Sequence, residues 1–154
     1  MKRFFLSLAL CLSAGAGFAQ SADTPAHAGF LKNVRGSVHL IDVSDQSRIA
    51  RPGETVRQSD RIETSANAGA SLVLRDGTVL VVGPSSRLNL REFQFDSTTH
   101  DGSIAVSLVQ GTLRVISGLL GKAHPEAVRV DTQTATIGIR GTDFIVSADT
   151  DTAL

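Results

Sequence analysis

The residues with the clearest potential for chemistry are Arg140, Gly141 and Thr142, at the centre of the stretch TATIGIRGTDFIV, residues 134–146. The guanidinium group of arginine offers five donors in a fixed fork and can bind a carboxylate with two hydrogen bonds. Glycine adopts positive φ without steric strain, so Gly141 predicts a turn or a bulge beside that fork. These residues therefore predict a turn that holds one arginine in place.

Two interpretations of Arg140 follow from the residues alone. Arg140 can form an ion pair that fixes the turn to a carboxylate of the same chain, and the candidates are Asp60, Asp76 and Asp131. It can instead contact a ligand or a partner protein. We favour the structural interpretation, because the guanidinium fork matches the geometry of a carboxylate.

A second candidate is the pair Leu119 and Leu120, two large apolar residues in the loop 118–121. The pair is either a small plug that folds back on the core or an exposed contact for a partner. Both interpretations stay open, because a patch of two residues is small.

No arrangement of side chains predicts catalysis or metal binding. A nucleophile needs a neighbouring base, and the four histidines are scattered over the chain: His27, His39, His100 and His124. No two of them have the spacing of metal ligands, and no carboxylate lies in an apolar setting that would raise its pKa. We therefore expect no enzyme activity, no metal site and no cofactor.

Residues 1–19 have the features of a secretory signal peptide. Lys2 and Arg3 precede an apolar run, and Ala19 is a small residue at the cleavage position, so we expect cleavage before Gln20. Cys11, the only cysteine, lies in the apolar run and leaves with it. The remaining 13 basic and 15 acidic residues give a net charge of −2, which does not favour nucleic acid as a partner. No other segment reaches about 18 consecutive apolar residues, so we expect no membrane span in the mature chain.

The rest of the chain predicts short strands and turns with almost no helix. Strand chemistry occurs over 34–41, 70–75, 78–82, 87–93, 104–108, 112–116, 128–130, 134–139 and 143–146, and apolar and polar residues alternate clearly over 87–93, 134–139 and 143–146. Turns are predicted at 51–54, Asp76-Gly77 and Gln110-Gly111. The predicted fold class is therefore all-β, either a small β-sandwich or an irregular β-solenoid-like module of short strands and hairpins.

The expected core follows from the faces of these strands. We expect burial of Leu72, Leu74, Val79, Val81, Leu88, Leu113, Val115, Val130, Ile137 and Phe144. The hairpin around Asp76-Gly77 is apolar on both faces, so we expect other elements to cover it on both sides.

Several segments resemble the FecR domain, a module of the bacterial cell envelope. The segments are DRIET (60–64), DGT (76–78) with PSS (84–86), QGTL (110–113) and IRGT (139–142). The resemblance extends over residues 36–147. It implies signalling or scaffolding in the envelope, and regulation of iron-siderophore uptake is the best-known setting of the family.

Two features differ from the sensor proteins of that family. Those proteins carry a cytoplasmic helical region and a membrane span before the domain, and they contact a sigma factor. This chain has a signal peptide in that place, so it resembles the secreted, stand-alone members. Such domains also usually continue past Arg-Gly-Thr with another strand pair, so we expect the domain to be trimmed or to be completed by a partner.

The predicted organisation is a signal peptide (1–19), a flexible arm (20–29), an all-β domain (30–148) and a polar tail (149–154). We expect a non-catalytic periplasmic or secreted domain that binds another envelope protein. A structural or adhesive cell-surface protein is the alternative.

Overall fold

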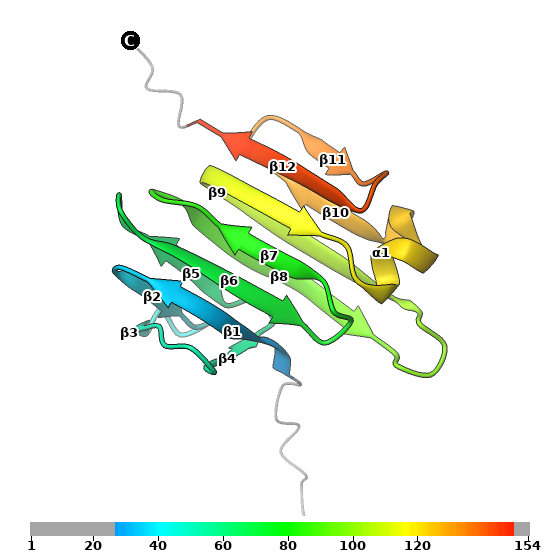
Figure 1. The fold of residues 1–154 in the computed structure, drawn as a ribbon, viewed down its shortest axis with the longest axis horizontal. Coiled ribbons are helices and arrows are strands. Elements are labelled where there is room, and N and C mark those ends of the chain that lie inside the picture. Colours follow the sequence, from blue (N-terminus) through cyan, green and yellow to red (C-terminus); the bar gives the residue numbers. More distant parts are fainter. Residues whose placement is uncertain (1–26, 150–154) are drawn as a thin grey trace, which may run out of the picture.

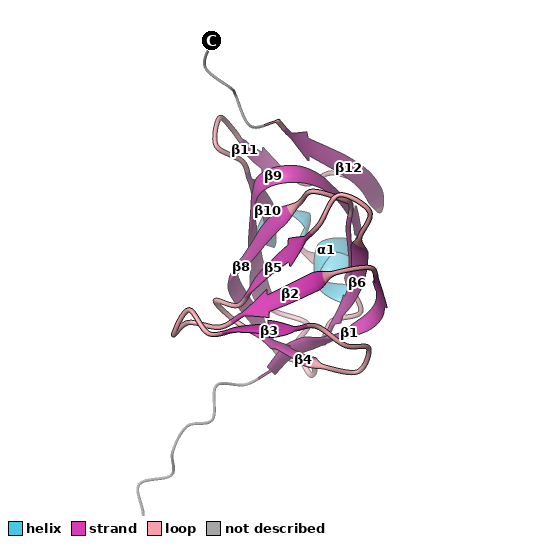
Figure 2. Ribbon diagram, turned by 90° about the vertical axis from the view of Figure 1, so that its left-hand side faces the viewer, coloured by secondary structure: helices cyan, strands magenta, loops and turns pink. Residues whose placement is uncertain are grey.

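The computed structural model describes residues 27–149, and these residues form an all-β fold, as the sequence predicts. They build one sheet of 12 strands, which curls until its two halves face each other across the core (Figure 1, Figure 2). We name the two halves layer A and layer B.

Layer A contains, in spatial order, β4 (Thr55–Arg57), β1 (His27–Arg35), β6 (Gly69–Leu74), β7 (Val79–Val82), part of β9 (Gly102–Ile116) and β12 (Asp143–Ala148). Layer B contains β3 (Ser47–Ile49), β2 (Val38–Ile41), β5 (Arg61–Thr64), β8 (Arg87–Phe95), the rest of β9, β10 (Val128–Asp131) and β11 (Thr136–Gly138). A short helix α1 (Leu119–Ala123) and a 3-10 turn η1 (Pro125–Ala127) connect β9 to β10. Neighbouring strands are antiparallel except for β9 and β10, so the fold is a curled sandwich rather than a solenoid.

β9 is the one described strand that pairs in both layers. Its first part pairs with β8 and β10 in layer B, and its last part pairs with β7 and β12 in layer A. Gly111 has a φ of 89° at the point where the strand changes layer, and glycine adopts this angle without strain. The predicted turn at Gln110-Gly111 is therefore wrong, because this single unusual residue bends the strand and does not reverse it.

The core lies between the layers and follows the predicted alternation along most strands. In β8, for example, Leu88 and Leu90 are buried while Arg87 and Arg91 are exposed. The expected core residues that are buried are Leu72, Leu74, Leu88, Leu113, Val115 and Val130. Ile137 and Phe144 are only half-buried, because they lie in edge strands.

The hairpin between β6 and β7 turns where the sequence predicts, but its loop is longer by one residue. The N–H of Leu74 donates to the carbonyl of Thr78 at 2.9 Å, so the loop spans 75–77 rather than Asp76-Gly77 alone. A shift of one residue in register moves every side chain of a strand to the opposite face.

The two faces of β7 are exchanged as a result. Leu80 and Val82 are buried, whereas Val79 is half-buried and Val81 is exposed. The exposure of Val81 shows that the outer face of the hairpin is not covered, so the expectation of cover on both sides is wrong.

The start of the domain also differs from the prediction. β1 begins at His27, and Ala28 is fully buried, so the ordered sheet starts before Phe30 and includes the end of the predicted arm. The single strand predicted over 34–41 is two strands, β1 and β2, because the chain turns at Gly36-Ser37 and passes from layer A to layer B. The following predicted segments lie outside the described residues: the signal peptide, the rest of the arm, and the tail after Asp149.

Two of the connections that return the chain from layer B to layer A lie at opposite ends of the sandwich (Figure 2). Residues 50–54 connect β3 to β4 at one end, and we name them the first crossing. Residues 139–142 connect β11 to β12 at the other end, and we name them the second crossing.

Hydrogen bonds to both layers fasten the first crossing. The N–H of Ala50 donates to the carbonyl of Val38 in layer B at 2.9 Å. In layer A, the N–H of Leu31 donates to the carbonyl of Glu54 at 2.8 Å. The carboxylate of Glu54 forms an ion pair with Arg48 of β3.

Candidate functional site

The Arg-Gly-Thr motif forms the second crossing (Figure 1). Gly141 has a φ of 146°, which other residues rarely adopt, and this agrees with a turn at the motif. Ser117, directly after β9, holds the turn with two hydrogen bonds. Its hydroxyl donates to the carbonyl of Gly141 at 3.1 Å, and its N–H donates to the carbonyl of Thr142 at 2.8 Å. The backbone of the motif is therefore fastened to layer A.

A groove of about 410 Å³ opens beside the motif, between the edge strands β11 and β12. Ile139 and Val146 in its lining are buried, and Ile137 and Phe144 are half-buried. Apart from Arg140 and Ser147, its side chains are apolar. The full lining is Ile137, Gly138, Ile139, Arg140, Phe144, Ile145, Val146 and Ser147.

Arg140 is exposed, and no carboxylate among residues 27–149 lies within ion-pair distance of it. The buried structural ion pair is therefore wrong for the three candidate carboxylates, which have other hydrogen-bond donors. The donors are the N–H of Arg57 to Asp60 (2.8 Å), the hydroxyl of Thr78 to Asp76 (2.6 Å) and the hydroxyl of Thr136 to Asp131 (2.8 Å).

The segments DRIET, PSS and QGTL meet at one point and build the framework. The hydroxyl of Thr64, the last residue of DRIET, accepts a hydrogen bond from the N–H of Ser86 at 2.9 Å. The hydroxyl of Ser86 accepts one from the N–H of Thr112 at 3.0 Å. Thr64 and Ser86 are buried, so these polar side chains stabilise the junction of β5, β8 and β9.

The segment DGT fastens the start of the short helix. The hydroxyl of Thr78 donates to the carboxylate of Asp76 at 2.6 Å and accepts from the N–H of Gly118 at 3.0 Å. The carbonyl of Asp76 accepts from the N–H of Leu119 at 2.8 Å. Asp76 and Thr78 are both buried, and their role is therefore structural.

The two leucines of this helix have different environments. Leu120 is fully buried in the core, whereas Leu119 is 47% exposed. The interpretation as a partner contact is therefore wrong for Leu120, and only Leu119 can meet another molecule.

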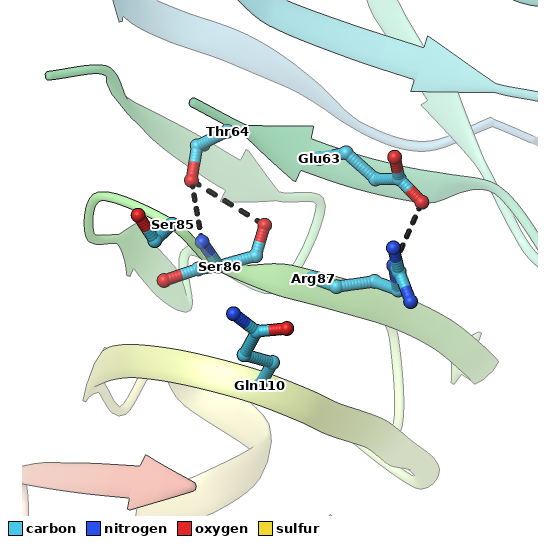
Figure 3. Close-up of a pocket in the computed structure, with 6 residues that line it drawn as sticks. All are labelled: Glu63, Thr64, Ser85, Ser86, Arg87 and Gln110. Carbon is cyan, nitrogen blue, oxygen red and sulfur yellow. Dashed lines mark hydrogen bonds and ion pairs between the residues drawn. The ribbon is translucent and has the colours of Figure 1, made fainter. Parts of the chain in front are cut away.

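A polar depression of about 240 Å³ lies over the junction of β5, β8 and β9 (Figure 3). Its walls include the ion pair between Arg87 and Glu63, at 2.8 Å, and the side chain of Gln110. The hydroxyls of Thr64 and Ser86 at this site are engaged with the backbone, and the lining contains no histidine. The carboxylate of Glu63, the acidic group in the lining, is paired with Arg87, so no hydroxyl of this depression is hydrogen-bonded to a general base.

Two carboxyl groups have pKa values that are shifted in opposite directions. Burial raises the pKa of Asp60, although the hydrogen bond from the N–H of Arg57 lowers it in part. The expectation that no carboxylate lies in such a setting is therefore wrong for Asp60. At the start of β12, the hydrogen bond from Arg114 lowers the pKa of Asp143, and Nε of Arg114 lies 2.9 Å from Oδ1 of Asp143.

His39 lies beside two serines that sequence reasoning did not connect with it. Its Nδ1 is 3.3 Å from the hydroxyl of Ser47, and its Nε2 is 3.4 Å from the hydroxyl of Ser37. The pairing of β2 with β3 brings Ser47 beside the ring. Both ring nitrogens face hydroxyls, so the ring lacks the carboxylate that orients the histidine of a catalytic triad.

Within 27–149, no three His, Cys, Asp or Glu side chains are grouped as metal ligands. In the same part of the chain, no helix is long and apolar enough to cross a membrane.

Comparisons with known proteins identify the family. Residues 60–154, more than half of the chain, match the family described as FecR protein. The match begins after the start of the resemblance noted in the sequence, so β1 to β4 precede it. No curated protein matches the chain. A solved structure titled "Cell surface anchoring domain" is 24% identical, with 40% of this chain and 82% of that chain covered and a TM-score of 0.39. By the match over residues 60–154, the chain belongs to the FecR protein family.

Proposed function

We propose that this chain is a non-catalytic domain of the bacterial cell envelope that binds another envelope protein through the second crossing. FecR proteins are a regulatory and signalling family rather than a family of known enzymes, which supports a role in binding. This binding serves signalling or scaffolding in the envelope. Because the family is linked to iron-siderophore uptake, a protein of an uptake system is the first candidate partner.

The contrast between Arg140 and the other family segments carries this proposal. The polar side chains of Thr64, Thr78 and Ser86 are used inside the fold. The side chain of Arg140 is exposed, has no carboxylate partner among residues 27–149, and lines an apolar groove. A charged side chain that the fold does not use, in a motif typical of the family, supports contact with a second protein.

Cross-linking and affinity capture from intact envelopes test the binding role. The wild-type chain is compared with Arg140→Gln and with the control Arg91→Gln, since Arg91 is an exposed arginine of β8 outside the groove. We expect Arg140→Gln to lose an envelope protein that the wild type and Arg91→Gln capture, while both variants melt like the wild type. Capture that is the same for all three proteins contradicts the proposal.

Export is part of the proposal. We expect residues 1–19 to be removed as a signal peptide and the mature protein to be periplasmic or secreted. Cell fractionation followed by N-terminal sequencing checks this expectation. Protein that starts at or next to Gln20 in the soluble fraction supports export, and protein with an intact Met1 in the membrane pellet contradicts it.

A further inference from the structure

β12 is the longest edge strand of the sandwich. The described residues have four edge strands, of which β3, β4 and β11 contain 3 residues each and β12 contains 6. Proteins usually protect sheet edges by short strands, by proline or by charged side chains, because an open edge can pair with another chain. β12 (DFIVSA) has no proline and no lysine, and its single charge is on Asp143, which is paired with Arg114.

The pairing pattern shows which backbone groups of β12 are open. In antiparallel strands, residues that exchange hydrogen bonds with the neighbouring strand alternate with residues that do not. The N–H of Ser117 donates to the carbonyl of Thr142, so the backbone of Thr142 faces β9. By the alternation, the groups that point away from β9 belong to Asp143, Ile145 and Ser147.

On the inner face of this open edge the side chains are apolar, and on the outer face Ile145 is the apolar residue between Asp143 and Ser147. A strand added next to β12 extends layer A over the groove, and its inward side chains meet Ile139 and Phe144. Its outward side chains lie beside Ile145, which is 69% exposed. A segment in which apolar residues alternate fits this place, because successive side chains of a strand point to opposite faces.

The charge at the groove adds a second requirement. Arg140 is the cation in the groove lining, and no carboxylate among residues 27–149 pairs with it. An acidic side chain on the incoming segment supplies the group that the guanidinium fork binds best.

We infer that β12 takes up an extended segment of the partner protein as an additional strand, with an acidic side chain of that segment against Arg140. This inference rests on the proposed function, since it names where and how the envelope partner binds. Main-chain hydrogen bonds to Asp143, Ile145 and Ser147 provide affinity, and the apolar groove and Arg140 provide specificity.

A proline substitution at Ile145 tests strand addition directly. The N–H of Ile145 points to the open edge, so Ile145→Pro removes a donor for an incoming strand and keeps the ladder to β9 intact. Ile145→Thr is the matched control, because it removes the exposed apolar side chain but keeps the N–H and the strand propensity. We expect Ile145→Pro to abolish partner capture and Ile145→Thr to retain most of it, with far-UV circular dichroism and melting close to the wild type for both.

Synthetic peptides test the acidic requirement. The probes are a short capped peptide of alternating valine and threonine with one aspartate, and the same peptide with asparagine instead. NMR titration of the wild-type domain with the aspartate peptide is expected to shift the backbone amides of β12. The asparagine peptide is expected to bind roughly tenfold more weakly, since a hydrogen bond to a charged group is lost. In Arg140→Gln, the two peptides are expected to bind equally.

The outcomes separate this inference from the proposed function. If Arg140→Gln loses the partner while Ile145→Pro keeps it, the envelope role stands and strand addition is wrong. If the wild type captures no envelope protein, the proposed function itself fails. If Ile145→Pro turns a dimer of the free protein into a monomer in light scattering, the occupant is a second copy. If peptides bind only after deletion of residues 150–154, the occupant is the chain's own end. The last two results overturn the assignment to a partner.

Discussion

The two crossings perform the same topological step at opposite ends of the sandwich, and they differ in how they are fastened. The first crossing bonds to both layers through Ala50 and Glu54, and its carboxylate is paired with Arg48. The second crossing bonds to Ser117 of layer A, and its guanidinium group has no carboxylate partner among residues 27–149. The carboxylate of Glu54 therefore helps to hold the first crossing in the fold, whereas the side chain of Arg140 in the second crossing, like that of Arg51 in the first, faces solvent.

The largest expected difference between the two ends is in packing. Leu31 is fully buried beside the first crossing, so Leu31→Ala is expected to lower the free energy of unfolding by about 2–5 kcal/mol. Phe144 is half-buried beside the groove, and Phe144→Ala is expected to lower it by roughly 1–2.5 kcal/mol, because part of the ring is already in water. Denaturant melts measure both losses. Equal losses would show that the second end is packed as tightly as the first.

A smaller effect is expected at the turn of the second crossing. Gly141 has a φ of 146°, so Gly141→Ala is expected to lower the free energy of unfolding by about 1–2 kcal/mol through backbone strain. Gly138 is the matched control, since a methyl group added at either glycine meets no atom within 4 Å and Gly138 does not have positive φ. Gly138→Ala is expected to change stability by less than about 0.5 kcal/mol. Equal effects of the two substitutions in thermal melts would mean that the motif does not need its glycine for the turn.

The charges of the two crossings provide a third comparison. Glu54→Gln removes the ion pair with Arg48 and weakens the bond from the N–H of Arg51, so a loss of about 1 kcal/mol is expected after allowance for partial exposure. Arg140→Gln is expected to stay within about 0.5 kcal/mol of the wild type. A loss at Arg140 as large as at Glu54 in urea melts would restore a structural role for the arginine.

The smallest expected effect is a difference in how the free energy of unfolding depends on pH. The pKa of Asp60, near the first crossing, is raised above 3.8 in the fold, mainly by burial. The ionised carboxylate therefore destabilises the fold above its folded pKa, and this penalty disappears as the pH falls toward 3.8. Asp60→Asn keeps an acceptor for the N–H of Arg57, so we expect it to be more stable than the wild type at neutral pH, with a gap that closes on acidification. A less stable Asp60→Asn at neutral pH would show that attraction to Arg48 and Arg57 outweighs burial.

The opposite pH dependence of stability is expected for Asp143, which begins β12 directly after the second crossing. The pKa of Asp143 is lowered below 3.8 by the hydrogen bond from Arg114. Its contribution to stability is present above 3.8 and is lost as the pH falls through the folded pKa. Arg114→Gln is therefore expected to be less stable than the wild type at neutral pH and equal to it in strong acid. Urea melts of the two proteins over a pH series measure this difference.

The sequence predicts the strands and turns more accurately than it predicts their register and their packing against each other. The alternation in β8 predicts its buried face, because adjacent residues of a strand point to opposite sides. The same reasoning fails in β7, since one additional loop residue, Arg75, reverses the faces. The Asp-Gly pair does not reveal the length of its loop, because glycine serves both two-residue and three-residue hairpin loops.

At the candidate site, too, contacts between residues that are distant in the sequence are not predicted. The sequence locates the motif and its glycine, but it assigns Arg140 to a buried ion pair that does not form. Which carboxylates approach an arginine depends on contacts between distant strands, and Asp60, Asp76 and Asp131 all find nearer donors. The groove beside Arg140 is likewise a product of topology, since β11 and β12 belong to different layers.

The shared strand β9 has a consequence for the time course of folding. Without it, the sheet is divided into two four-stranded pieces, β3-β2-β5-β8 and β7-β6-β1-β4, the pair β10-β11 and the single strand β12, and each four-stranded piece leaves one apolar face in water. The two four-stranded pieces become joined by pairing only when residues 102–116 have been synthesised. Because β9 also pairs with β12, near the end of the described chain, folding depends on contacts over long sequence separations. Such chains fold slowly, on the order of milliseconds to seconds.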